Sequence, residues 1–396
     1  MAITVTDRRM VPIRIGINRL GVVIAVLVAV GLILPFAAFR ANRIVAGVGQ
    51  SLLQSIEPAH APLVFGSLIV VALIALFRTP APLRGLASLA ALAVLLVTAG
   101  AAARYLTPAG DKLARISPDS GFWVLGFAFA VMFADALVQV KPKPSVRIGT
   151  LLLLLCALAA LLGSGALSEL SVFKEYANRA ESFWHEAETH IVLAFGSLAA
   201  ALVVGVPLGI AAVRYTRLRV VTLNILNVVQ TIPSIALFGL LIPPLAWVAA
   251  TVPGAAKLGI AGIGEAPALL ALFGYALLPV VANTVIGILG VPPAVNDAAR
   301  GMGMTDGQRL FQVELPLAFP VILTGIRIVL VQNIGLATIA ALIGGGGFGV
   351  FVFQGIGQTA MDLVLLGAVP TVILAFTAAI VLDALVEMVQ RPSATE

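Results

Sequence analysis

Ten long apolar segments constrain this chain of 396 residues more than any other feature. Most of them reach the roughly 20 residues that a helix needs to cross a hydrocarbon layer about 30 Å thick. Backbone polar groups in lipid must be satisfied within the membrane, and the segments lack the alternating pattern of a β-barrel. We therefore predict an all-α, polytopic integral membrane protein with about ten transmembrane helices. The predicted spans are residues 20–39, 62–77, 85–103, 121–140, 147–167, 191–213, 220–248, 266–289, 319–342 and 362–388.

The composition agrees with a membrane protein and argues against several other classes. Hydrophobic residues make up 60% of the chain and charged residues only 11%, whereas a soluble domain has about a quarter charged residues. A net charge of +6 would indicate nucleic acid binding in a soluble protein. Here the basic residues flank membrane spans, so no nucleic acid partner is expected. No metal site and no cofactor are predicted, because the chain has one cysteine and scattered histidines, Cys156, His60, His185 and His190.

The distribution of Lys and Arg predicts the orientation of the chain. If the N-terminus is cytoplasmic, fifteen of these residues fall on the cytoplasmic side and eight on the outer side, with Arg327 inside a span. Cytoplasmic connectors collect basic residues, so both termini are expected in the cytoplasm, with the chain in a bacterial inner membrane. Arg8, Arg9 and Arg14 before the first span also leave a signal peptide open, although no clear small-x-small cleavage site follows.

One cytoplasmic connector, residues 290–318, carries its own pattern, DAARGMGMTDGQRLFQVELP at 297–316. We predict a short helix–turn–helix with Asp297 near a helix start, Gly303 in the turn, and Thr305 or Asp306 as a cap. Pro316 is expected to stop the segment before the next span. The alternative is an ordinary amphipathic connector. The candidate docking residues are Asp297, Ala298, Ala299, Gly303 and Pro316, with an apolar face of Leu310, Phe311, Val313 and Leu315.

Polar residues inside two spans are candidates for a translocation path. Pro233 and Pro243 interrupt an apolar segment, so they are expected to bend a helix and free backbone carbonyls. Side chains nearby could satisfy those carbonyls or line a path, and polar groups in the later span should face another helix or a pore. The candidates are Gln230, Thr231, Ser234, Gln332, Asn333 and Thr338.

Together these motifs resemble the permease subunits of ABC importers for osmoprotectants. The 297–316 connector resembles their "EAA" coupling loop, with Asp297 where Glu is commoner and Val313 where Ile is commoner. The flanking sequences GSLAAALVVGVPLGIAAVRY (196–215), QTIPSIALFGLLIP (230–243), FGYALLPVVANTVIGI (273–288) and QNIGLATIAALIGGGGFG (332–349) resemble the same family. The resemblance covers about residues 190–390 and not 1–167.

The resemblance implies a type I ABC importer permease core whose loop docks onto cytoplasmic ATPase subunits. It also implies an extracytoplasmic solute-binding protein, a second permease copy in a homodimer or heterodimer, and lipid around the helices. The solute implied is glycine betaine or a related quaternary amine. The chain contains no GxxxxGK[ST] phosphate-binding loop, so we predict a transport subunit and not an enzyme. Three alternatives remain: another small polar solute such as an amino acid, an ion-coupled secondary transporter using Asp135, and a membrane scaffold or sensor.

The chain is expected to have three parts. Residues 1–167 form an N-terminal extension of about five spans, and residues 190–390 form the permease core of five spans with the coupling loop 290–318. Between them, residues 168–189 are predicted to form an external amphipathic helix, because apolar side chains recur at three- and four-residue spacing. That helix is expected either to lie at the interface, anchored by Trp184, or to dock a binding protein.

Overall fold

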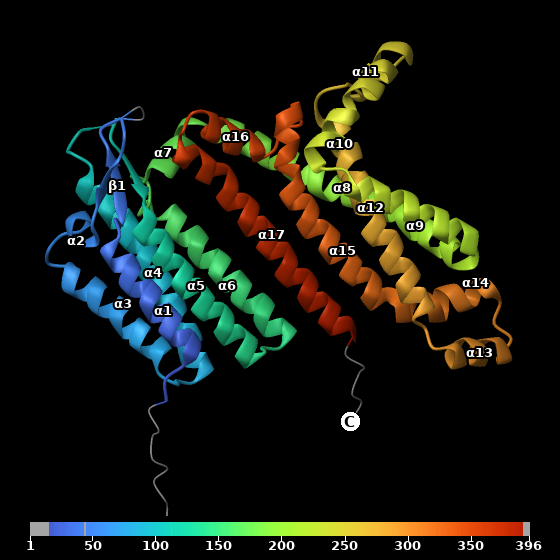
Figure 1. Ribbon diagram of the computed structural model, residues 1–396, viewed down its shortest axis with the longest axis horizontal. Helices are drawn as coiled ribbons and strands as arrows, with labels where there is room; N and C mark the ends of the chain where they lie inside the picture. The colour runs from blue at the N-terminus through green and yellow to red at the C-terminus, as the bar shows by residue number, and fades with distance from the viewer. Residues whose placement is uncertain (1–15, 43–44, 112, 391–396) are drawn as a thin grey trace, which may run out of the picture. The chain divides into compact units, whose positions relative to one another are not determined.

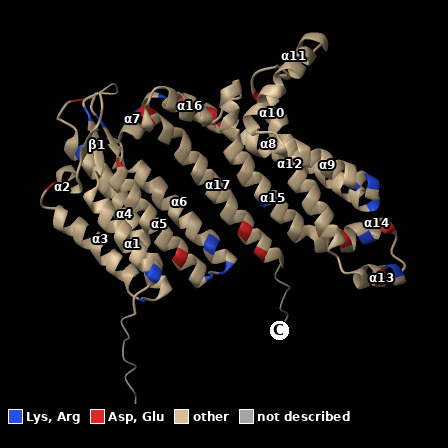
Figure 2. Ribbon diagram, in the orientation of Figure 1, with Lys and Arg blue, Asp and Glu red and all other residues tan. Residues whose placement is uncertain are grey.

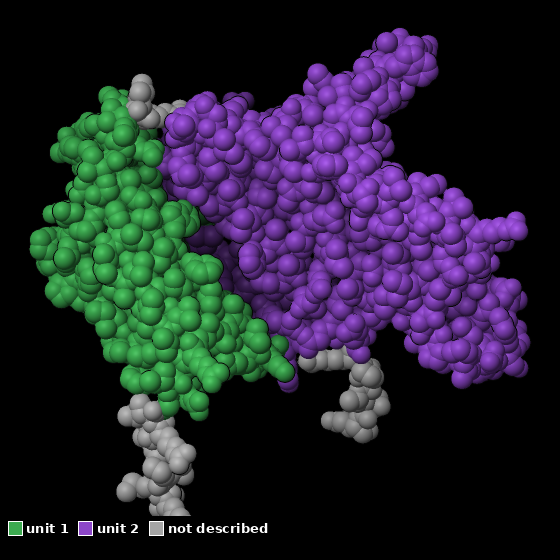
Figure 3. All heavy atoms as spheres, in the orientation of Figure 1, with its two compact units in different colours: residues 1–142, 159–171 green, residues 143–158, 172–396 purple. Residues whose placement is uncertain are grey.

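The computed structural model describes residues 16–42, 45–111 and 113–390, and these residues form helices and one small sheet (Figure 1). The chain divides into two compact units, residues 1–142 with 159–171 and residues 143–158 with 172–396 (Figure 3). Helix α6 (Pro144–Gly163) contributes residues to both units. Several basic residues that entered the orientation count lie outside the described residues: Arg8, Arg9, Arg14, Arg43, Lys112 and Arg391.

Eight described helices are long and apolar enough to cross a membrane. They are α4 (Ala81–Leu106), α5 (Ser120–Val140), α6, α8 (Ala180–Arg214), α12 (Glu265–Leu289), α17 (Met361–Gln390) and the composite segments Ser234–Thr251 and Asp306–Ala337. The segments predicted at 20–39 and 62–77 form shorter helices, α1 (Arg19–Ile33) and α3 (Ala61–Leu76), of 15 and 16 residues. The predicted helical, polytopic membrane fold is confirmed.

The first unit is a bundle of α1, α3, α4 and α5 with a small antiparallel sheet. Strands β1 (Ala37–Arg40), β2 (Val48–Gln50) and β3 (Arg115–Pro118) pair in the order β2-β1-β3, and a short helix α2 (Leu52–Ser55) follows β2. Helix α1 packs closely on α3, since a Cβ on Gly21 would lie 1.9 Å from the Ala75 carbonyl oxygen. The sheet was not predicted, because strands of three or four residues carry too little periodicity to identify.

Asp135, considered above as a proton carrier, is paired within the first unit. Its carboxylate accepts a hydrogen bond from the buried guanidinium of Arg84 at 2.8 Å, and Gln139 one turn later donates to the same carboxylate at 2.9 Å. The pair joins α4 to α5. A charged side chain in a membrane helix is stabilised by such a partner, so the structure gives Asp135 a packing role.

The second unit is built on four helices, since α12 packs against both α8 and α15 (Leu315–Ala337), and α17 packs against α15. Small residues line the contacts of α12: an added Cβ on Gly205 would meet Val280, and one on Gly287 would meet Ala318. Small residues let helix backbones approach closely where no hydrophobic effect drives association. Charged side chains of this unit gather at helix ends, and the central turns of α8 and α12 carry none (Figure 2).

Replacing Gly209 by alanine should measure how tight the α8–α12 contact is. A Cβ at Gly209 would lie 2.7 Å from Thr284 Cβ, so overpacking of about 1–3 kcal/mol should exceed the roughly 1 kcal/mol gained in helix propensity. We expect a lower melting temperature in detergent. Gly196→Ala on the same helix is the control, because its Cβ would have its nearest neighbour, Leu269, at 3.7 Å. Equal melting temperatures for the two variants would contradict the tight contact.

The predicted single span at 220–248 is wrong. The structure has α9 (Thr216–Thr231), a break at Ile232, then α10 (Ser234–Leu240) and α11 (Ile242–Thr251). Pro233 lacks an N–H and holds Ile232 in an extended conformation, which ends α9 rather than bending it. The Ile232 carbonyl accepts a hydrogen bond from the Tyr275 hydroxyl of α12. Pro243 lies in the first turn of α11, where no N–H is needed.

The segment 168–189 forms two helices instead of one. Helix α7 (Ser171–Asn178) ends at Asn178, and α8 then runs without interruption from Ala180 through the predicted span. The apolar side chains of this region pack inside the unit: Phe183 lies against Phe348 and Phe351 of the α16 (Gly349–Gly357) region. Trp184 remains 63% exposed. The apolar face is therefore mostly covered by the chain itself.

The four-glycine connector after α15 is held by hydrogen bonds to α8 and to its own turn. The short 3-10 helix η3 (Ile339–Ile343) ends at Gly344, and three of the glycines have positive φ. The Gly347 N–H donates to the Glu186 carboxylate of α8 at 2.6 Å, and Gly345 N–H donates to the Ala340 carbonyl at 2.9 Å. A second 3-10 turn, η1 (Ala256–Leu258), precedes α12. The connector is therefore tied to α8.

Candidate functional site

The candidate coupling loop is a helical hairpin between α12 and α15. Helix α13 (Pro293–Gly301) is followed by a turn, then by α14 (Asp306–Arg309) and a π-helical turn, η2 (Leu310–Glu314), that runs directly into α15. Gly303 has φ +80°, the left-handed conformation that glycine adopts without strain. Its N–H donates to the Arg300 carbonyl at 2.9 Å. The predicted helix–turn–helix is therefore present, with the glycine in its turn.

Thr305 provides the cap of the second helix. Its hydroxyl accepts from the Gln308 N–H at 3.3 Å, and the Gln308 side chain accepts from the Thr305 N–H at 2.9 Å, which is a capping box. Asp306, the other candidate, instead forms an ion pair with Arg309 at 2.9 Å. Of the two capping residues considered, the structure selects Thr305.

Asp297 lies in the middle of α13 and not at its start. The helix begins at Pro293, because proline suits the first helical turn, so Asp297 is one full turn inside. Its carboxylate lies 3.9 Å from the Arg300 guanidinium, and both side chains are exposed. Ala298 is exposed and Ala299 is buried. The predicted place of Asp297 near a helix start is therefore wrong, and Ala299 is the buried residue of α13, which packs on η2 and α14.

The apolar side chains expected on one face at 310–315 do not all point the same way. Leu310 and Leu315 pack against the buried cluster of Ile288, Ala318 and Ile322, and Val313 is half-buried. Phe311 is 70% exposed, and Met302 in the turn is 71% exposed. The surface that a partner could contact therefore consists of Phe311 and Met302, whereas Leu310 and Leu315 hold the loop onto its own helices.

Pro316 does not stop the segment, which corrects the prediction. The helix continues from α14 through η2 into α15, and Pro316 is near the start of α15. A proline inside a helix lacks an N–H and its ring crowds the carbonyl four residues earlier. The π-helical turn immediately before it widens the backbone at that level. Pro316 therefore lies in the first turn of α15, directly after the π-helical turn.

A buried charge network at the base of the loop was not identified from the sequence. The Glu314 carboxylate accepts from Arg309 Nε at 3.0 Å and from Arg214 Nη2 at 2.5 Å. Its side chain is only 3% exposed and that of Arg309 only 5%. Arg214 is the last residue of α8 and lies 100 positions earlier in the chain. Sequence spacing alone gives no signal of such a contact.

The six candidate path residues do not form one cavity. Gln230 donates to the Tyr275 carbonyl of α12 at 2.9 Å, and exposed Thr231 donates to Val228 of its own helix at 2.7 Å. Asn333 is fully buried and donates to Ser197 of α8 at 2.8 Å, so it faces another helix. Ser234 and Thr338 are half-buried at the ends of α10 and α15.

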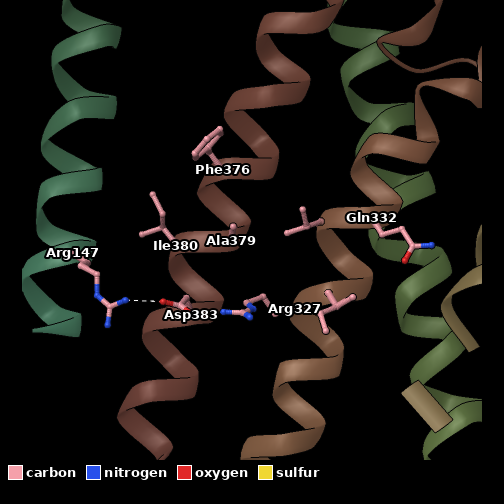
Figure 4. Close-up of a pocket in the computed structure, with 9 residues that line it drawn as sticks. Arg147, Arg327, Gln332, Phe376, Ala379, Ile380 and Asp383 are labelled. Atoms are coloured by element: carbon pink, nitrogen blue, oxygen red, sulfur yellow. Dashed lines mark hydrogen bonds and ion pairs between the residues drawn. The ribbon is translucent and has the colours of Figure 1, made fainter. Parts of the chain in front are cut away.

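Gln332 is the one of the six that lines a pocket of about 600 Å³ formed by α6, α15 and α17 (Figure 4). At the charged end of this pocket, Arg147 of α6 donates to the Asp383 carboxylate of α17 at 2.6 Å. Arg327 of α15 donates to the same carboxylate, so this arginine inside a span is paired there. Arg147 also pairs with Glu387. The other lining residues are Ile328, Val331, Phe376, Ala379 and Ile380.

A bundle of membrane-length helices with a polar helical hairpin between two of them defines a polytopic integral membrane protein. Comparison with known proteins specifies the class. The family model described as binding-protein-dependent transport system inner membrane component matches residues 201–392. The osmoprotectant import permease protein OsmW of Salmonella typhimurium is 41% identical over 201 residues, which are 51% of this chain and 86% of that protein. The chain belongs to the family of ABC importer permeases, and the predicted resemblance to its osmoprotectant branch is confirmed.

A second curated relative agrees with this assignment. The carnitine transport permease protein OpuCB of Listeria monocytogenes is 38% identical over 186 residues, covering 47% of this chain and 78% of that protein. A solved chain of the MetNI methionine ABC transporter in inward-facing conformations aligns with a TM-score of 0.46 and 23% identity, over 54% of this chain and 96% of that one. Residues 18–173 match a separate model, described as ABC transporter permease YehY, N-terminal domain. As a permease of this family, the chain is a transport subunit and not itself an enzyme.

Proposed function

We propose that this chain imports glycine betaine or a related quaternary amine as the permease subunit of an ATP-driven transporter. The named relatives transport osmoprotectants or carnitine, which supports that solute class. The proposed partner in the cytoplasm is an ATPase subunit that binds the coupling loop. The single observation that carries this proposal is the hairpin 293–314, which leaves Phe311 and Met302 exposed while it is fixed to two long helices.

We propose that both termini and the coupling loop lie in the cytoplasm. Arg217 and Arg219 follow α8, whose last residue, Arg214, contacts the base of the loop, and Arg300 lies in the loop itself. Figure 2 shows Lys or Arg positions on α9 and on α13. The clustering supports a cytoplasmic location, because connectors on that side collect Lys and Arg. The membrane would then be a bacterial inner membrane.

A second permease copy is the proposed partner within the membrane. Helix α11 has no buried residue, Trp247 on it is 66% exposed, and in Figure 1 the helix projects from its unit. Helix α9 has only Leu226 buried and exposes Val221, Ile225 and Val228. Apolar faces of this kind fit either lipid or another helix. An external solute-binding protein is proposed at the opposite end, near α7 and the glycine connector.

We retain the proposed division into an extension (1–167), a linking segment (168–189) and a permease core (190–390). We also retain the proposed path residues, of which Gln332 has the strongest support because it lines the pocket in Figure 4. In this mechanism the ATPase subunits close on ATP and move the loops, and the attached helices alternate access to the solute.

Reconstitution tests the proposal. In proteoliposomes, the chain with its ATPase and binding protein should take up labelled glycine betaine only when ATP is supplied, because the chain has no phosphate-binding loop of its own. The chain alone should take up none.

Uptake by the chain alone, driven by an ion gradient and lost in Asp135→Asn, would instead establish a secondary transporter. ATP-dependent uptake of an amino acid, with no uptake of glycine betaine, choline or carnitine, would keep the transporter class and overturn the solute.

A further inference from the structure

Glu314 receives two arginines from two different segments at the base of the coupling loop. Arg309 comes from α14 of the loop itself, at 3.0 Å from Oε1. Arg214 comes from the end of α8, at 2.5 Å from Oε2 and 3.4 Å from Oε1, so its guanidinium contacts both oxygens. A carboxylate that accepts a guanidinium through both oxygens is held in orientation as well as in position.

Burying the charges of this network costs free energy of folding, so its presence indicates a role in the fold or the mechanism. The side chains of Glu314 and Arg309 are 3% and 5% exposed, and that of Arg214 is 34% exposed. Charges are expensive to remove from water, and an apolar group of similar size often stabilises a protein as well. The loop already has apolar anchors, because Leu310 and Leu315 pack on the same level as Ile210 and Val213 of α8. The charges therefore add something that apolar packing does not supply.

The two helices above the loop are connected to it in different ways. Helix α15 continues from the loop through the backbone, since residues 306–337 form one continuous helical segment. Helix α8 is connected only through side chains, because its residues lie about 100 positions away in the sequence. Apolar side chains can slide past one another, whereas an ion pair through both carboxylate oxygens fixes direction.

We propose that Glu314 is a positioning residue that makes α8 move together with α15 when the coupling loop is displaced. This proposal rests on the proposed function, in which an ATPase moves the loop. Arg214 is the α8 side chain that binds the Glu314 carboxylate, and Arg309 holds this carboxylate within the loop. Without Glu314 the ATPase would still bind the exposed surface of Phe311 and Met302, but movement of the loop would reach α8 less directly, through the packing of α8 on α15 and the Asn333–Ser197 contact higher in the unit.

The test compares Glu314→Gln and Arg214→Met with the wild-type chain, reconstituted with ATPase and binding protein. We expect ATPase co-purification within about twofold of wild type, and glycine betaine uptake per ATP hydrolysed lower by about fivefold, within the range of measured coupling effects. Arg214→Lys keeps a charge and should recover part of the uptake. Arg217→Met is the matched control, since Arg217 is exposed nearby, and it should leave the ratio unchanged.

Three outcomes would overturn the proposal. One is an unchanged ratio of uptake to ATP hydrolysis in Glu314→Gln. Another is parallel loss of folded protein, ATPase binding and uptake at a constant ratio, which would make Glu314 only a stabilising residue. The last is an Arg217→Met variant as uncoupled as Arg214→Met. Failure of the wild-type chain to bind the ATPase would be a different result, because it would refute the proposed function itself.

Discussion

Replacing Phe311 by glutamate is expected to abolish capture of the ATPase while the chain remains folded. Phe311 is 70% exposed on the loop, so its removal costs little internal packing. An exposed aromatic side chain that enters a partner's groove commonly contributes about 2 kcal/mol or more to binding, which corresponds to roughly a thirtyfold loss of affinity. The measurement is the amount of ATPase that co-purifies with the detergent-solubilised chain, together with its melting temperature.

Gln312→Glu is the matched control for this variant. It places the same new charge one residue away, on another exposed side chain of the same π-helical turn. We expect it to bind the ATPase nearly as well as the wild-type chain. If both variants lose the ATPase equally, the charge and not the loss of the aromatic side chain is responsible, and Phe311 has no special role.

Replacing Asp383 by leucine is expected to destabilise the second unit, because Arg327 loses its partner and Arg147 loses one of its two carboxylates. Asp383 accepts hydrogen bonds from both Arg147 and Arg327 (Figure 4). Removing one partner of a fully buried pair costs about 3–5 kcal/mol, and these side chains are partly exposed, so we expect about 2 kcal/mol. The measurement is the melting temperature in detergent and the yield of monodisperse protein.

The double variant Asp383→Leu with Arg327→Leu separates the effect of an unpaired charge on stability from the effect of altered packing. It removes the unpaired charge, while Arg147 keeps its pair with Glu387. We expect it to be more stable than Asp383→Leu alone, since an ion pair replaced by apolar groups is often neutral or stabilising. A double variant that is less stable than the single one would show that packing around Asp383, and not its charge, holds α15 and α17.

The elements that follow from local sequence were predicted well. Apolar segments of membrane length locate the long spans, because lipid leaves the backbone almost no alternative to a helix. The turn at Gly303 was also predictable, because its left-handed conformation suits glycine and little else. The same reasoning located the coupling loop between two spans, although its role in ATPase binding stays a prediction.

Two proline positions misled the sequence analysis in opposite directions. Pro233 was expected to bend a helix and ends one, whereas Pro316 was expected to end a segment and lies within one. What decides each case is the surrounding backbone. A π-helical turn precedes Pro316. The Tyr275 hydroxyl of α12 donates a hydrogen bond to the Ile232 carbonyl, directly before Pro233. Neither the turn nor the tyrosine contact is visible in local composition.

Charge pairs over long sequence distances were the part that the sequence could not supply. Arg327 lies 56 residues from Asp383, and Arg214 lies 100 residues from Glu314. Each arginine alone is compatible with a side chain that extends to the membrane surface. Only the packing of α15 against α17 brings a carboxylate to Arg327. Only the packing of α8 near the loop brings a carboxylate to Arg214. Contacts of the path candidates were equally out of reach of the sequence, since Asn333 contacts Ser197 of a distant helix.

The π-helical turn η2 changes the direction in which the side chains after it point, relative to those before it. A wide turn shifts the angular phase of everything after it, by up to about 100° for one extra residue. Phe311 in the turn and Gln332 in the span above can therefore be oriented independently, although one continuous helical segment carries both. Substitutions that change how the loop binds the proposed ATPase need not rotate the helix face that lines the pocket. The sequences of the two surfaces can therefore change separately in evolution.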